Sequence, residues 1–161
     1  MAGLTPRERL QPSLLDRLRD DPPDGPHGMR GVTAAQLRES VRRDLGWLLN
    51  CVRVEPPCGG RRVEDSVLCF GIPDLAGMSA EGLDADALRR ALHAAILRFE
   101  PRLMGGTLSV EVERGGTGAA SRTLSFRIES VLWAQPLPLR IRLDTEADLE
   151  TFRFATPDEP E

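Results

Sequence analysis

Apolar residues recur at helical spacing in two stretches of the chain. Thr33 and Gln36 form a capping-box pattern, which predicts a helix whose apolar positions are Leu37, Val41, Leu45 and Leu48. A second helix is predicted from about Asp84 to near Glu100, because Pro101 restricts the residue before it. Each helix carries charged residues opposite its apolar stripe. We expect Arg42 and Arg43 to belong to such a solvated face.

After the second helix the period of the pattern changes to two, which is typical of half-buried strands. The alternation predicts three strands, at 108–113, 124–129 and 139–143, and allows a fourth short edge strand at 151–154. Gly-rich and Pro-rich segments separate the first three. An additional short apolar run at Val67–Phe70, closed by Gly71 and Pro73, predicts a strand or a turn packed under the core.

Helices followed by an antiparallel meander predict an α+β fold. We expect a single small domain, in which an antiparallel sheet of three to four strands packs on two main helices and leaves its other face wet. The chain divides into a helical arm with linker at 1–31, the α+β domain at 32–155 and an acidic tail at 156–161.

The arm is predicted from leucines at helical spacing before the Pro- and Gly-rich segment 20–26: Leu10, Leu14, Leu15 and Leu18. Two interpretations stay open at this point. The arm either waits for a partner or packs on its own domain.

Composition narrows the class of function. The 161 residues are 40% apolar and 29% charged, as expected for one globular domain. Asp and Glu number 25 against 21 basic residues, all of them arginine, and the net charge of −4 argues against a nucleic-acid binder. The N-terminus has no apolar signal segment and no stretch is long enough to span a membrane. We therefore expect a cytoplasmic protein without direct membrane insertion.

Candidate catalytic and metal-binding groups are sparse. His27 and His93 are not placed beside a nucleophile, and the spacing of the cysteines matches no common zinc site. The Gly115–Gly118 loop lacks the Lys and the following helix of a phosphate-binding loop. We expect no cofactor, no metal and no enzyme activity.

One segment does break local rules. Glu100 places a carboxylate at a helix C-terminus, where the helix dipole disfavours negative charge. Because Pro101 forces Glu100 out of the helical region, Glu100 and Arg102 are expected on the same side of an extended stretch. Such a pair suits bidentate contacts with another chain. An ordinary helix stop is the alternative.

Three segments together resemble the TssE family, a baseplate component of the bacterial type VI secretion system that is related to a phage wedge protein labelled "lysozyme-like". They are Ser66–Leu75, Phe99–Leu103 and the strand Leu124–Ile128. The resemblance runs from Leu14 to about Leu143 and implies a non-enzymatic structural role. It implies partners among the other wedge subunits (TssF, TssG and TssK) and the sheath proteins (TssB and TssC), with Glu100, Pro101 and Arg102 holding the wedge.

The solvent-exposed sheet suggests a second contact with a partner protein. An outer strand at Leu139–Leu143, with Leu139 and Ile141 as contact residues, offers backbone groups that an extended arm of a sheath subunit can pair with. The expected function is thus an adaptor that links the wedge to the contractile sheath and templates the first sheath ring. The alternatives are a peptidoglycan hydrolase and a baseplate protein of a phage-derived contractile particle.

Overall fold

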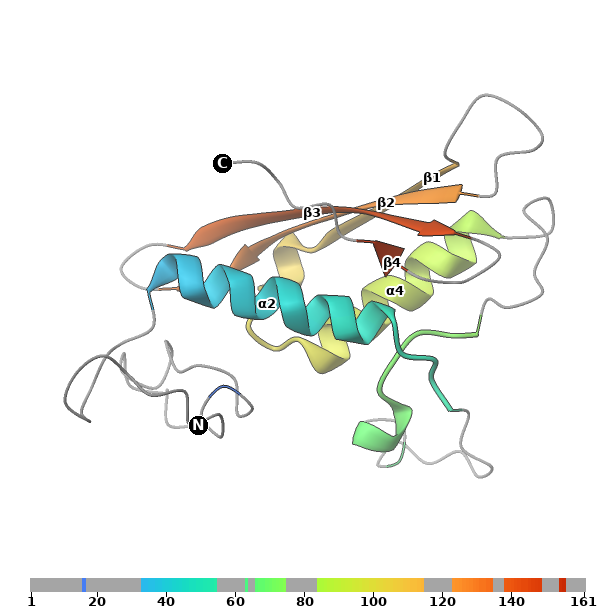
Figure 1. Ribbon diagram of the computed structural model, residues 1–161, viewed down its shortest axis with the longest axis horizontal. Coiled ribbons are helices and arrows are strands. Elements are labelled where there is room, and N and C mark those ends of the chain that lie inside the picture. Colours follow the sequence, from blue (N-terminus) through green and yellow to red (C-terminus); the bar gives the residue numbers. More distant parts are fainter. Residues whose placement is uncertain are drawn as a thin grey trace.

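Two helices cover one face of an antiparallel sheet in the computed structural model (Figure 1). The structure describes residues 16, 33–54, 63, 66–74, 84–114, 123–134, 138–148 and 154–155. Its helices are α2 (Ala34–Leu49) and α4 (Ala85–Phe99), with short 3₁₀ turns η1 (Val67–Cys69) and η2 (Gly105–Thr107). Its strands are β1 (Ser109–Arg114), β2 (Thr123–Leu132), β3 (Leu139–Asp148) and β4 (Phe154–Ala155). The predicted α+β fold is confirmed.

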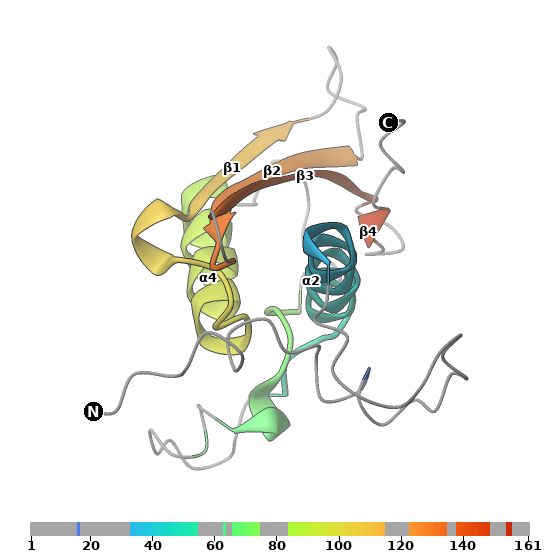
Figure 2. The ribbon, with the colours of Figure 1, turned by 90° about the vertical axis from the view of Figure 1, so that its left-hand side faces the viewer.

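The strands follow one another across the sheet in the order β1-β2-β3-β4, so the sheet is a simple antiparallel meander. Ile128 in β2 stands between Val110 of β1 and Leu143 of β3, and this register puts apolar residues of all three strands on one face. Figure 2 shows α2 and α4 side by side beneath that face. The other face carries the polar positions of the alternation.

Both helices begin where the sequence pattern placed their N-termini, and α4 ends where its predicted end lies. The Thr33 side chain accepts from the Gln36 backbone N–H, and the Gln36 side chain accepts from the Thr33 backbone N–H, so the capping box is present. Asp84 caps α4 by accepting from two backbone N–H groups, and Glu100 ends that helix. The dihedral angles of Glu100 (φ −122°, ψ 76°) are non-helical, as expected of a residue before proline.

The core lies between the helices and the sheet. Every second residue of β2 from Leu124 to Leu132 is buried, while their neighbours are exposed or half-buried. The ring centroids of Phe126 and Phe154 lie 5.1 Å apart, so the hydrophobic core extends to β4. Each helix contributes an apolar stripe, and these members of the two stripes are at most 4% exposed: Leu37, Val41, Leu45, Leu48, Leu88, Leu92 and Ile96.

Several segments differ from expectation. β2 continues to Leu132, beyond the predicted end at 129, and the described β4 is Phe154–Ala155 where 151–154 was predicted. β3 continues to Asp148, beyond the predicted end at 143, because Thr145 and Ala147 also turn inward and are buried. The run at Val67–Cys69 is a 3₁₀ turn whose Cys69 is buried, but Val67 and Leu68 are 82% and 71% exposed, so the prediction that they pack under the core is wrong.

Several predicted features fall outside the described residues: the Gly115–Gly118 hairpin tip, residues 135–137 of the corner before β3, and the acidic tail. Of the arm only Asp16 is described, and its backbone is helical. Within the described part of the chain, neither helix has the length and apolarity needed to cross a membrane.

Candidate functional site

A buried ion pair forms where α4 ends. Glu100 is only 4% exposed, and the Arg102 guanidinium donates hydrogen bonds to both oxygens of its carboxylate. The Arg102 Nε donates to Glu100 Oε1 over 2.6 Å, Nη2 donates to Oε2, and the Arg102 backbone N–H adds a third bond at 3.2 Å. The predicted placement of the two side chains on one side of an extended turn is confirmed. This bidentate geometry is the strong form of a charge-assisted hydrogen bond.

Arg102 also binds the neighbouring helix. Its Nη2 donates to Asp44 Oδ2 over 2.6 Å and its Nη1 donates to Ser40 Oγ over 3.2 Å, and both acceptors belong to α2. Four of the five donors of an arginine side chain are therefore engaged within the chain. Arg102 joins the end of α4 to the middle of α2.

The network continues to the N-terminal arm. Asp16 accepts from Arg43 Nη1 and Nη2 over 2.6 and 2.9 Å, and from Ser40 Oγ over 2.9 Å. Arg43 in turn donates to Asp44 and lies over the ring of Trp47, 5.0 Å from its centroid. Asp16 thus ties the arm to α2, which favours the interpretation that this part of the arm packs on its own domain.

The charges of the network support one another. The hydrogen bond that Arg43 donates to Asp16 raises the pKa of the Arg43 guanidinium, burial opposes it, and Asp44 raises the pKa further. For Arg102, burial is the largest influence and lowers the pKa, but Glu100 and Asp44 together outweigh it, so the pKa is raised. Both arginines keep their charge.

Backbone contacts anchor the same turn to the sheet. The Trp133 N–H donates to Arg102 O and the Met104 N–H donates to Val131 O, both over 2.9 Å. Leu103 forms an antiparallel bridge with Leu132. We call Glu100, Arg102, Asp44 and Ser40 the brace, because together with these contacts they connect α2, the end of α4 and the end of β2.

Sequence reasoning found only half of the brace. Ser40, Arg43, Asp44 and Trp47 recur at i, i+3, i+4 and i+7 along α2, a second stripe beside the apolar one that the pattern contained but that we did not single out. The expectation that Arg43 lies on a solvated face is wrong, because its side chain is 28% exposed and bound to Asp16 and Asp44.

The second predicted contact is the outer strand. Among the described residues, β4 pairs with β3 at Glu146 and Ala147, and no strand pairs with the outer edge of β3 from Leu139 to Thr145. The side chain of Ile141 is buried and that of Leu139 is half-buried, both on the core face. Their role in partner binding stays a prediction.

The hydrogen bonds of β4 show which backbone groups this edge presents. In an antiparallel strand the N–H and C=O of one residue point to one neighbour, and those of the next residue point to the other. The Phe154 N–H and C=O both bond to the Asn50 side chain, over 3.0 and 3.2 Å, so they point away from β3. Ala155 therefore faces β3 opposite Glu146.

From Glu146 the alternation continues along the strand, so the residues that direct N–H and C=O to the open edge are Arg140, Arg142 and Asp144. The hydrogen bonds that β2 makes on its side away from β3 lead to the same assignment. Val131, the partner of Arg140, donates its N–H to Thr107 Oγ1 and accepts at its C=O from Met104, both away from β3. Leu139, Ile141 and Leu143 consequently direct their backbone groups to β2.

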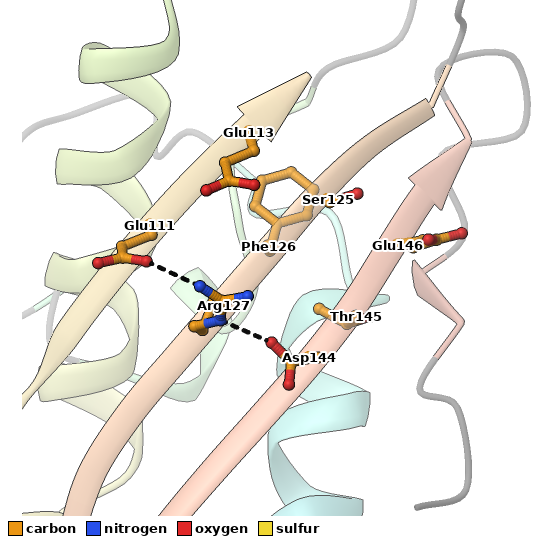
Figure 3. A pocket seen from close by; sticks show the side chains of 8 residues that line it. All are labelled: Glu111, Glu113, Ser125, Phe126, Arg127, Asp144, Thr145 and Glu146. Atoms are coloured by element: carbon orange, nitrogen blue, oxygen red, sulfur yellow. Dashed lines mark hydrogen bonds and ion pairs between the residues drawn. The ribbon is translucent and has the colours of Figure 1, made fainter. Parts of the chain in front are cut away.

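Charged side chains cross the outer face of the sheet in a line. Arg127 donates to Asp144 over 3.0 Å and to Glu111 over 3.4 Å, linking three strands beside a hollow of about 280 Å³ (Figure 3). Arg142 Nε donates to Asp144 Oδ2 over 2.7 Å. The Arg142 hydrogen bond is the main cause that lowers the pKa of Asp144; burial opposes it and Arg127 adds to it.

We expect the variant Arg142→Ala to raise the pKa of Asp144 toward the ordinary value of about 3.9, because the main stabiliser of the carboxylate is gone. NMR titration of the carboxyl carbon measures this. Since the folded pKa lies below the unfolded one, the pair stabilises the fold above the unfolded pKa and loses this contribution as the pH falls through the folded pKa. Arg140→Ala, which removes a charge outside this network, should leave the titration unchanged; an unchanged value in Arg142→Ala would contradict the assignment.

Other candidate chemistry is weak. His93 is half-buried on α4, and Cys51 and Cys69 are free thiols. His27 and Cys58 lie outside the described residues. In the part of the chain that is described, no group of three or more His, Cys, Asp or Glu residues is arranged to hold a metal ion.

Comparison with known proteins identifies the family. A family model described as "Baseplate wedge protein gp25" matches residues 35–137, more than half of the chain. The match includes all of α2 but its first residue, the Glu100–Arg102 turn and β2, and it ends just before β3. Searches of curated proteins and of solved structures gave no match. The chain belongs to the gp25 family of baseplate wedge proteins.

Proposed function

We propose that this protein is a structural subunit of a type VI secretion baseplate that joins the wedge to the contractile sheath and templates the first sheath ring. Membership of a baseplate wedge family supports the structural role. The observation that carries the sheath contact is the open edge of β3, where Arg140, Arg142 and Asp144 present N–H and C=O groups. An extended segment of a sheath subunit would satisfy these groups by adding a strand.

Asn50 supports the choice of β3 over β4 as the site of strand addition. Its side-chain amide bonds both backbone groups of Phe154 that point outward, so the outer side of β4 is already satisfied at this residue. A strand added to β3 would lie in line with β4 and continue the ladder that β4 begins.

The wedge contact is proposed at Glu100, Pro101 and Arg102. Pro101 is exposed and lies in the chain between the two paired residues. Trp133, whose backbone N–H donates to the Arg102 carbonyl oxygen, is 42% exposed. Arginine and tryptophan are enriched among the residues that dominate binding energy at protein interfaces. In this proposal the brace gives the turn a fixed shape, and the turn with its surroundings meets the other wedge subunits.

The geometry gives less support to peptidoglycan hydrolysis. Such an enzyme uses two carboxyl groups at a defined separation, one of them protonated. The acid that is buried in the described residues, Glu100, is instead clasped by Arg102 in an ion pair. The gp25 family is a baseplate family, which is compatible with a non-enzymatic role.

The experiment that tests the sheath contact compares Arg142→Pro with Arg142→Ala. Proline removes an N–H that faces the open edge and leaves the β2–β3 hydrogen bonds in place, a position where strands tolerate it. We expect Arg142→Pro to fold, with a free energy of unfolding within about 1 kcal/mol of that of Arg142→Ala, and to lose co-purification with the sheath proteins of the same organism.

Arg142→Ala is the matched control, because it removes the same side chain but keeps the N–H. Circular dichroism and thermal unfolding confirm that each variant is folded. Sheath binding that is equal in the proline and alanine variants would show that no strand is added at this edge.

A further inference from the structure

The outer face of the sheet is graded in charge along β3. At the Leu139 end, a hollow of about 430 Å³ is lined by two arginines, Arg140 and Arg142, against one carboxylate, Glu129. At the other end, the 280 Å³ hollow of Figure 3 is lined by four carboxylates against Arg127. The two ends therefore attract ligands of opposite charge.

Arg140 differs from the other arginines of this face in the contacts that the described residues make with it. It is exposed, and among the described residues nothing forms a hydrogen bond or an ion pair with it, whereas Arg127 and Arg142 both bind carboxylates. Its register partner across the sheet is Val131, which offers no charge. The backbone of Arg140 points to the open edge, so a strand added there would place a side chain directly beside the guanidinium.

We propose that the open edge of β3 selects its incoming strand by charge. The selected sheath segment has apolar and charged residues in alternation. Two of its charged residues are acids, two positions apart, whose carboxylates face Arg140 and Arg142. The apolar residues between them would extend the core face beside Ile141 and Leu143. At the Asp144 position the incoming residue is basic or uncharged. Opposite charges across strands stabilise pairing and like charges oppose it, so this pattern fixes the register that backbone bonds alone would leave free.

This inference rests on the proposed sheath contact and adds the chemistry of the partner segment. The test measures binding of the purified sheath protein complex to the wild-type chain, to Arg140→Glu/Arg142→Glu and to Arg89→Glu/Arg90→Glu. The last variant changes the net charge equally, but its arginines are exposed on α4, away from β3. Overlapping 12-residue peptides covering the sheath sequences are then probed with the wild-type chain.

We expect Arg140→Glu/Arg142→Glu to weaken sheath binding about 10-fold or more, the α4 variant to bind like wild type, and wild-type binding to weaken as salt rises. The bound peptide should contain the alternating pattern with two acids. Equal binding of both double variants would overturn the charge selection while leaving strand addition in place. Failure of the folded wild-type chain to bind the sheath complex would overturn the adaptor function, and the charge selection with it.

Discussion

Replacing Arg102 with alanine is expected to lower the free energy of unfolding by about 3–5 kcal/mol, the range found when one partner of a buried ion pair is removed. The substitution leaves the Glu100 carboxylate, which is 4% exposed, without its ion-pair partner. It also removes the cation that Asp44 shares. The hydrogen bonds that join the end of α4 to α2 are removed as well. Urea unfolding followed by circular dichroism measures the change.

A double variant shows whether the buried charge is the cause. In Glu100→Gln/Arg102→Ala no ionised group is left in the turn, so we expect part of the lost stability to return relative to Arg102→Ala alone. Arg102→Lys keeps the charge but cannot reproduce the bidentate geometry, and should lie between wild type and alanine. An Arg102→Ala chain as stable as wild type would mean that the brace does not hold the helices together.

The same variants separate the brace from the proposed wedge contact. Below its unfolding temperature, Arg102→Ala is expected to lose co-purification with the other wedge subunits but to keep sheath binding, since β3 is unchanged. If the folded variant binds the wedge normally, the wedge contact lies elsewhere on the surface and the Glu100–Arg102 pair has a stabilising role only.

Gly71→Ala is expected to cost about 3 kcal/mol, because strain at an unfavourable backbone conformation and a steric clash act together. Gly71 has φ +125°, a conformation that residues with a side chain rarely adopt. A Cβ at this position would lie 2.3 Å from the carbonyl oxygen of Cys51, so the two segments would have to separate. The affected bonds are those of Arg53 N–H to Ile72 O and Ile72 N–H to Cys51 O.

Gly46→Ala is the matched control for this prediction. Gly46 lies within α2, and a Cβ there meets nothing within 4 Å. Alanine should therefore stabilise the helix by about 0.5–1 kcal/mol, through its better helix propensity. Thermal unfolding of both variants gives the comparison. A Gly71→Ala chain that gains stability as Gly46→Ala does would contradict the described conformation at Gly71.

The two proposed contact surfaces lie on connected parts of the fold. Arg102 O accepts the Trp133 N–H directly after β2, and Leu132 at the end of β2 pairs with Leu139 at the start of β3. A displacement of the Glu100–Arg102 turn would thus act on the end of the sheet where the open edge begins. This connection gives a short covalent and hydrogen-bonded route between the two proposed contact surfaces.

Local rules were sufficient for much of the fold. The capping box at Thr33, the helix stop before Pro101 and the alternation of β2 each depend on residues a few positions apart, and each is present in the structure. The same is true of the ion pair between Glu100 and Arg102, whose two side chains are separated by a single proline.

Contacts between distant segments required the tertiary structure. Asp44 lies 58 residues from Arg102, and Asn50 lies 104 residues from Phe154, so no spacing along the chain could indicate either pair. The open edge was foreseen as a strand, but which of its residues face outward depends on hydrogen bonds made by β4 and β2 on either side. By itself the sequence determined the elements, because helix and strand periodicity are local. The brace was decided only by packing, which sets which carboxylate meets which arginine. Packing also decides which N–H groups of β3 point to β2 and which point to the opposite edge.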